Sequence, residues 1–165
     1  MTEKRCPAET VTVVIRQSTT NDAESIGFLA GEFQSYLRAL GHKADFDWDA
    51  KKYLRDGFGE DPAFEGLVAE VDSTVVAYAL HHAGYDTDRG QRIVYLIDLY
   101  VSQAFRRCGI GEKLMQRIAE IGRTRGAELI AWSVSKRNAT ALRFYEKLRA
   151  RYVDELHVMW VPIEM

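Results

Sequence analysis

The chain has 165 residues, of which 47% are hydrophobic and 28% are charged, a length and composition typical of one globular domain. Its 22 basic and 24 acidic residues give a net charge of -2, which argues against a general nucleic-acid-binding protein. No segment approaches the roughly 20 apolar residues of a membrane-spanning helix, so we expect no membrane partner. The composition favours small molecules or other proteins as partners.

The two cysteines, Cys6 and Cys108, lie far apart in the sequence, and neither they nor the four histidines show the spacing of a metal site. We therefore predict no metal ion, and the small number of cysteines favours a reducing, cytoplasmic location. Residues 1–10 are polar and lack the apolar run of a signal peptide. We interpret them as a flexible N-terminus that precedes a single domain over residues 11–165.

The first part of the chain predicts one strand and two helices. Residues 11–19 are rich in β-branched side chains, which indicates a strand. Residues 20–22 can cap a helix that carries apolar residues at spacings of three and four and ends at Gly41. A second helix is expected over residues 48–58, where the sequence GFGEDP stops it.

The rest of the chain predicts a hairpin followed by alternating strands and helices. Residues 66–84 divide at Asp72-Ser73 into two strands, and residues 92–101 form the longest β-prone run, with Asp98 as a charge inside it. After two glycines, a helix with one apolar stripe ends near Gly126. The later elements expected are a strand over 128–135, a helix over 138–148 and a strand over 155–163. This order predicts an α/β domain whose sheet has mixed strand directions.

Two glycines, Gly109 and Gly111, stand between a predicted strand and a predicted helix. Such a turn can present backbone N–H groups and the positive end of the helix dipole to a phosphate. A nucleotide-binding P-loop is excluded because Gly111 is followed by Glu112 and Lys113, and a dinucleotide fingerprint is excluded because its third glycine is replaced by Leu114. From the residues alone, the glycines could also merely permit a tight turn.

The sequence RRCGIG, residues 106–111, follows the strand LIDLYV and resembles the acetyl-CoA diphosphate loop of the GNAT N-acetyltransferase superfamily. The later sequence NATALRFYEK, residues 138–147, resembles the second cofactor element of the same superfamily, and the intervening strand ELIAWSVS also matches. Within the superfamily the chain looks most like the diamine acetyltransferases of the spermidine/spermine type and their bacterial relatives. The stretches that carry this likeness are VIRQST, DGFGEDP, LVAEV, GYD, YLIDLYV and FYEK.

The resemblance implies a GNAT-type fold, with a mixed, mostly antiparallel central sheet flanked by helices. It also implies acetyl-CoA as cosubstrate, with the acetyl and pantetheine end on the backbone of the central strand and the diphosphate on the glycine loop. The implied cofactor-binding residues are Leu99, Tyr100, Val101, Arg106, Arg107, Cys108, Gly109, Ile110, Gly111, Glu112, Ala131, Trp132, Ser133, Asn138, Ala139, Thr140 and Ala141.

Two residues are candidates for catalysis. Asn138 and Tyr145 are two helical turns apart and share a face, and the resemblance makes Tyr145 the general acid that protonates the departing sulfur of CoA. On spacing alone Tyr145 could instead be a core tyrosine. Burying the charged carboxylate of Asp98 in a central strand costs free energy unless it is paired, hydrogen-bonded or required for function. It could therefore bind the amine or accept its proton. Its alternative role is that of a structural hydrogen-bond acceptor.

The chain departs from the diamine acetyltransferases at the acceptor side. Their acidic pair Glu-Asp is Ile97-Asp98 here, so the family's proposed base is absent, and an aromatic residue of the GYD region is replaced by Asp88. The glycine that commonly follows the catalytic helix is also missing from residues 148–150. Tyr36, Asp88 and Glu155, together with Asp98, are the candidates for binding the acceptor amine.

The leading hypothesis is an acetyl-CoA-dependent N-acetyltransferase that acts on a primary amine of a small molecule, polyamine or amino-acid-like, by direct attack in a ternary complex. Two alternatives share the same cofactor site: a non-catalytic acyl-CoA-binding module, and an enzyme that acetylates a peptide or protein. A covalent acetyl-cysteine mechanism at Cys108 is a further possibility from thiol chemistry. The resemblance also implies a homodimer with the last strand near the partner.

Overall fold

The computed structural model describes residues 12–43, 47–155, 158–159 and 161–163. They fall into two compact units, which we call the N-terminal unit, up to Ser133, and the C-terminal unit, from Val134. The predicted flexible N-terminus, residues 1–10, lies outside the described residues. The single domain over residues 11–165 stays a prediction.

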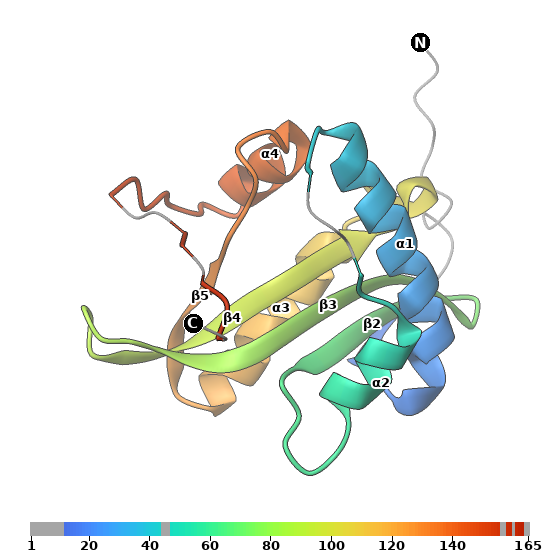
Figure 1. The fold of residues 1–165 in the computed structure, drawn as a ribbon, viewed down its shortest axis with the longest axis horizontal. Coiled ribbons are helices and arrows are strands. Elements are labelled where there is room, and N and C mark those ends of the chain that lie inside the picture. Colours follow the sequence, from blue (N-terminus) through green and yellow to red (C-terminus); the bar gives the residue numbers. More distant parts are fainter. Residues whose placement is uncertain (1–11, 44–46, 156–157, 160, 164–165) are drawn as a thin grey trace. The chain divides into compact units, whose positions relative to one another are not determined.

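The N-terminal unit is built on a five-stranded sheet in which the strands lie in sequence order. Neighbouring strands are antiparallel except β4 and β5, which are parallel. Helices α1 and α2 cover one face of the sheet and α3 covers the other (Figure 1). The elements are β1 (Val13–Gln17), η2 (Thr20–Asp22), α1 (Ala23–Ala39), α2 (Ala50–Gly57), β2 (Glu65–Val71), β3 (Thr74–Asp86), β4 (Gln91–Val101), η3 (Gln103–Phe105), α3 (Ile110–Thr124) and β5 (Ala127–Trp132). The predicted mixed, mostly antiparallel sheet with flanking helices is confirmed.

Apolar spacing in the sequence explains how the helices are placed. Ile26 and Leu29 of α1 are buried with Tyr53 of α2 and with Tyr78 and Leu80 of β3 in one hydrophobic cluster. On the other face α3 buries a stripe at helical spacing, as its amphipathic pattern predicts. The fully buried residues of that stripe are Ile110, Leu114 and Ile118.

A bidentate ion pair fixes the start of α1. The guanidinium of Arg16 on β1 donates to both carboxylate oxygens of Asp22, at 2.8 and 2.7 Å, and to Glu70 at 2.6 Å. The hydrogen bonds from Arg16 lower the pKa of Asp22, whose carboxylate also accepts from the backbone N–H of Thr19, the residue before η2. Residues 20–22 thus form η2, and Asp22 is the N-cap residue of α1 without a side-chain hydrogen bond to that helix.

The C-terminal unit contains α4 (Ala139–Lys147), which agrees with the predicted helix over residues 138–148. The predicted strand over residues 155–163 is wrong for the described residues of that range, none of which is in a strand. The prediction used β propensity alone. That preference is weak and context-dependent, because a strand is stabilised only when its backbone pairs with a neighbouring strand.

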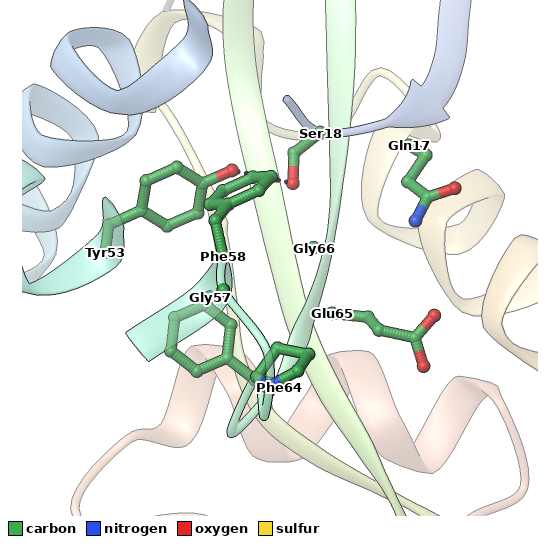
Figure 2. Close-up of a pocket in the computed structure, with 10 residues that line it drawn as sticks. Gln17, Ser18, Tyr53, Gly57, Phe58, Phe64, Glu65 and Gly66 are labelled. Carbon is green, nitrogen blue, oxygen red and sulfur yellow. Dashed lines mark hydrogen bonds between the residues drawn. The ribbon is translucent and has the colours of Figure 1, made fainter. Parts of the chain in front are cut away.

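A pocket of about 240 Å³ lies beside the end of β1 and the start of β2, away from every predicted site residue. Its wall includes the rings of Tyr53, Phe58 and Phe64, and Ser18 lies at the end nearest β1 (Figure 2). The hydroxyl of Tyr53 donates to Ser18 Oγ at 2.8 Å, which ties α2 to β1. Gly66 of β2 leaves the room that this hydrogen bond needs.

We expect Gly66→Ala to destabilise the protein by about 1–3 kcal/mol, because its new Cβ would lie 2.2 Å from Ser18 Oγ. The matched control is Gly31→Ala in α1, where a Cβ meets nothing within 4 Å. Alanine has a higher helix propensity than glycine, so the control should gain about 0.5–1 kcal/mol. Urea denaturation measures both changes, and a Gly66→Ala variant as stable as wild type would contradict the crowding argument.

Candidate functional site

Asp98 lies on β4 with its side chain on the face of the sheet that α1 and α2 cover. Its Oδ2 accepts a hydrogen bond from the hydroxyl of Tyr78, at 3.5 Å between the two oxygens. Burial raises the pKa of Asp98 to about 6, and the hydrogen bond from Tyr78 opposes that rise. Burial also raises the pKa of Tyr78 well above its usual value, so Tyr78 keeps its proton and acts as a donor. Asp98 is thus a carboxylate that can exchange a proton near neutral pH.

A β-bulge in β4 turns Asp98 toward this face. Ile97 is the extra residue, since its neighbours Leu96 and Asp98 pair with consecutive residues of β3. Upstream of the bulge, Val94 faces α3, because a Cβ added to Gly122 of α3 would meet the Val94 side chain at 3.1 Å. In a regular strand Asp98, four residues after Val94, would face α3 as well. The bulge therefore decides which face receives the carboxylate.

The strands β4 and β5 pair over only part of their length. Their parallel register ends with Leu96 opposite Trp132, whereas β4 continues to Val101. The edge of Leu99, Tyr100 and Val101 that points away from β3 is thus not paired with β5. An unpaired strand edge offers backbone N–H and C=O groups to an extended ligand. This is where the sequence predicts the acetyl and pantetheine end of the cofactor.

The predicted residues of β5 lie where the two strands stop pairing. Ala131 pairs with Tyr95, and Trp132 pairs with Leu96, at the end of the register. The hydroxyl of Tyr95 also lies 3.0 Å from Ser133 Oγ, so a side-chain hydrogen bond extends the contact by one residue. Beyond that point no described residue of β5 pairs with β4.

The loop before α3 presents the start of that helix without a side-chain cap. Gly109 is the N-cap residue, with a left-handed φ of +74°, and the helix begins at Ile110. Gly111 therefore lies in the first turn of α3 and only Gly109 needs a glycine conformation. The first N–H groups of a helix have no partner inside it, so the amides from Ile110 onward point toward the loop. Such amides, together with the helix dipole, can bind an anion, and the diphosphate site that the sequence places here stays a prediction.

The backbone of the same loop is strained at Arg107, which has a φ of +66°. A residue other than glycine in this region costs on the order of 1–2 kcal/mol. Its neighbour Arg106 has an ordinary extended backbone. Contacts elsewhere in the loop must therefore hold Arg107 in place.

The side chain of Arg106 lies against α1. Its Nε donates to the Val101 carbonyl at 3.0 Å, and its guanidinium carbon lies 4.9 Å from the ring centroid of Tyr36 and 5.4 Å from that of Tyr100. The hydroxyl of Tyr100 donates to Glu32 of α1 at 3.3 Å. Arg106, predicted to bind the cofactor, and Tyr36, predicted to bind the acceptor, are thus in direct contact.

Asp88, another predicted acceptor residue, is exposed in the turn between β3 and β4. The neighbouring Asp86 is occupied by two hydrogen bonds from Arg89. At ~3.4 Å per residue of antiparallel strand, the turn lies on the order of 20 Å along β4 from Asp98. The structure therefore does not bring Asp88 beside Asp98.

The remaining predicted residues belong to the C-terminal unit. Asn138 is the N-cap of α4, and its Oδ1 accepts a hydrogen bond from the Ala141 N–H at 3.1 Å. Ala139 and Thr140 form the first turn of the helix, and Tyr145 lies in its last part, with its ring centroid 5.1 Å from that of Phe144. Glu155 lies in a turn after the helix. The roles of these residues in binding and catalysis stay predictions.

Three further observations concern the cysteine, possible metal sites and possible membrane-spanning helices. Cys108 is disulfide-bonded, and the described residues contain no free cysteine, so this structure offers no thiol for an acetyl-cysteine. Within the described residues, no group of three or more His, Cys, Asp or Glu side chains is arranged to hold a metal ion. None of the helices in the described ranges is long and apolar enough to cross a membrane.

Sequence reasoning missed two residues on the face of the sheet that carries Asp98, namely Tyr78, which contacts Asp98, and Glu32, which contacts Tyr100. Tyr78 is one of two tyrosines in β3, and the register of the pairing with β4 would have been needed to place its hydroxyl beside the Asp98 carboxylate. Glu32 stands four residues before Tyr36 on α1, one helical turn away, which is a spacing that could have suggested a shared face.

Comparison with known proteins agrees with this geometry. A family model described as the acetyltransferase (GNAT) family matches residues 28–149. The thialysine N-epsilon-acetyltransferase of Bos taurus is 32% identical over 151 residues, which cover 87% of this chain and 86% of that protein. The spermidine/spermine N(1)-acetyltransferase-like protein 1 of Homo sapiens is 33% identical over 103 residues, which cover 58% of this chain and 15% of that protein.

The fold also has close counterparts among solved structures. An integron cassette protein from the mobile metagenome of V. cholerae matches with a TM-score of 0.74 and 24% sequence identity, over 92% of this chain and 93% of that one. The match to the family model begins in α1 and ends just beyond α4, so it contains the bulged strand, the glycine loop and Tyr145. As the sequence motifs predict, the chain belongs to the GNAT acetyltransferase family.

Proposed function

We propose that this chain transfers an acetyl group from acetyl-CoA to a primary amine of a small molecule, by direct attack within a ternary complex. One observation carries the proposal. Asp98, a carboxylate whose burial raises its pKa to about 6, immediately precedes the backbone edge that β5 leaves unpaired. A proton acceptor next to a strand edge that can hold an extended thioester is the arrangement that acetylation of an amine requires.

The described residues fit acetyl-CoA at two places. The uncapped start of α3, with left-handed Gly109, suits the diphosphate, and the unpaired edge of Leu99 and Val101 suits the amide groups of the pantetheine arm. Bound there, acetyl-CoA supplies a thioester that is reactive toward an amine. The Val101 carbonyl on this edge accepts a hydrogen bond from Arg106 Nε.

Each side chain is proposed to make one proton transfer. Asp98 takes a proton from the ammonium form of the acceptor, directly or through water, and the neutral amine then forms the new C–N bond as the C–S bond breaks. Tyr145 donates its phenolic proton to the departing sulfur, and the proton that the new amide nitrogen loses restores the phenol through solvent. In the diamine acetyltransferases a glutamate stands at the position of Ile97, which has no ionisable group. Asp98 is therefore proposed as the base.

The nature of the acceptor is supported by the relatives, which are named for thialysine and for spermidine or spermine. These molecules are cationic, and Asp98 and Glu32 provide negative charge on the α1 face of the sheet. We therefore propose a polyamine or an amino-acid-like amine, with Tyr36 on the acceptor side. Asp88 is proposed only for the far end of a long acceptor, since the turn that holds it lies well away from Asp98 along β4. Glu155 is proposed as a further acidic residue for a cationic acceptor.

The proposed function is tested with a panel of amines. We expect release of the free thiol of CoA with thialysine, lysine, ornithine, spermidine or spermine, and mass spectrometry should show one added acetyl group. Aminoglycosides and a lysine-containing peptide complete the panel. Turnover confined to the peptide would favour a protein acetyltransferase, while CoA binding measured by calorimetry without turnover on any amine would favour a non-catalytic acyl-CoA-binding module.

We also propose a homodimer, as the sequence resemblance implies. A cytoplasmic location is a separate proposal that rests on the small number of cysteines, and the disulfide bond of Cys108 counts against it. Sedimentation at micromolar protein concentration tests the dimer, and a monomer there would contradict it. The cytoplasmic location is tested by tagging the chain at its C-terminus and fractionating the cells that express it.

A further inference from the structure

Arg106 connects two parts of the molecule that the proposed function assigns to different substrates. Its backbone belongs to the glycine loop, next to strained Arg107 and three residues before Gly109. Its guanidinium lies over the ring of Tyr36 on α1 and near the ring of Tyr100 on β4. A cation held close to two aromatic faces is attracted to both. One side chain therefore contacts the donor loop, the central strand and the acceptor helix.

The contacts continue from Arg106 to Asp98. Tyr100, under the guanidinium, donates to Glu32 of α1, and its ring centroid lies 6.3 Å from that of Tyr78. Tyr78 in turn donates to Asp98. A continuous series of side-chain contacts thus runs from the loop that would receive the diphosphate to the carboxylate that would receive the proton.

We propose that Arg106 is a positioning residue that couples the two substrates, so that binding of CoA to the glycine loop orders the α1 segment on the acceptor side. This inference rests on the proposed function. The physical reason is conformational entropy. Fixing the backbone of Arg106 and Arg107 around a bound diphosphate also fixes the guanidinium, and with it the rings that lie beneath it. An acceptor that binds afterwards then finds Tyr36 and Glu32 already ordered.

Hydrogen–deuterium exchange of the wild-type chain, with and without CoA, tests the coupling without any acceptor or turnover. We expect CoA to slow exchange of the α1 peptide that contains Glu32 and Tyr36 at least about fivefold, the lower end of typical coupling factors. Arg106→Met should still bind CoA through backbone amides, but its α1 exchange should no longer respond. Arg106→Lys should recover part of the response, because lysine keeps the charge but loses the planar donor to Val101.

Two further variants separate coupling from simple stabilisation. Tyr36→Leu should reproduce the Arg106→Met result and Tyr36→Phe should not, since only the ring is needed for the cation contact. Arg117→Met on α3, whose guanidinium pairs with Glu120 at 2.8 Å, controls for the loss of an exposed arginine and should leave the α1 response unchanged. If Arg106→Met and Tyr36→Leu retain activity, loss of the contact between Arg106 and Tyr36 should raise KM for the amine more than KM for acetyl-CoA.

The outcomes distinguish failure of the coupling from failure of the proposed function. If CoA binds the wild-type chain but α1 exchange is unaffected, or if Arg106→Met responds like wild type, the coupling is overturned and the proposed function stands. If CoA does not bind the wild-type chain, the proposed function fails first and the coupling with it.

Discussion

Replacement of Asp98 by asparagine is expected to lower kcat/KM for the acceptor amine by about 10²–10⁴-fold, the usual contribution of a general base. Asparagine keeps the size and a hydrogen-bond acceptor for Tyr78 but cannot take up a proton. The CoA-release assay at pH 7.5 measures the loss. Asp61→Asn, which changes an exposed carboxylate in the loop after α2, is the matched control and should retain full activity.

The pKa of Asp98 also predicts how activity changes with pH. The pKa of Asp98 is about 6, so the carboxylate is mostly ionised at pH 7 and becomes protonated as the pH falls through 6. Wild-type kcat/KM should therefore decline below about pH 6, and the residual activity of Asp98→Asn should lack that decline. A variant that keeps the same low-pH limb would show that another group titrates there.

The same pKa predicts an opposite effect on stability. Burial raises the folded-state pKa of Asp98 from 3.8 to about 6, so between these values the folded chain binds more protons than the unfolded one. The contribution of Asp98 to the free energy of unfolding is therefore most favourable at low pH and is lost as the pH rises through 6. Asp98→Asn removes the buried charge, and at pH 8 it should gain on the order of 1–3 kcal/mol. Urea denaturation at pH 8 would contradict this if the variant were less stable.

Tyr145→Phe is expected to lower kcat by about 10²-fold or more, because phenylalanine cannot protonate the departing sulfur. The ring is retained, so its contact with Phe144 and the fold of α4 should persist. The defect should shrink when acetyl-CoA is replaced by an acetyl thioester of a more acidic thiol, since such a leaving group needs less proton donation. Rates for the two donors with each enzyme measure this difference.

A second tyrosine of the same unit provides the control for Tyr145. The hydroxyl of Tyr152 donates to Glu146 at 2.9 Å, so Tyr152→Phe removes a hydrogen-bonded phenol that has no assigned catalytic role. It should keep wild-type kcat with both donors. If Tyr145→Phe behaves like Tyr152→Phe, the acid must be a different group.

Most of the fold could be predicted from local patterns. The hairpin turn was located at Asp72-Ser73, and both residues have positive φ values, +48° and +61°, as a two-residue hairpin turn requires. The helix before Gly41 and the helix after Gly109 were recognised from apolar spacing, since a buried stripe leaves a period in the sequence. The strand predicted over residues 155–163 is wrong for the described residues of that range, because the pairing with another strand that a strand needs leaves no such period in the sequence.

The site was less predictable than the fold. Asp98 could be identified because a charge in an apolar strand is unusual, and Gly109 because left-handed backbone favours glycine. Neither the bulge at Ile97 nor the direction of the Arg106 side chain could be predicted. Both depend on contacts between residues far apart in the sequence, and the residue types themselves are compatible with either geometry.

The bulge at Ile97 also resets the phase of β4. The alternation of side chains before Ile97 is set by packing against α3, as at Val94, and the alternation after it is set by packing against α1, as at Tyr100. A one-residue shift in either half would move its side chains to the other face of the sheet. The length of the strand between Val94 and Tyr100 is thus fixed by contacts with helices on both faces of the sheet.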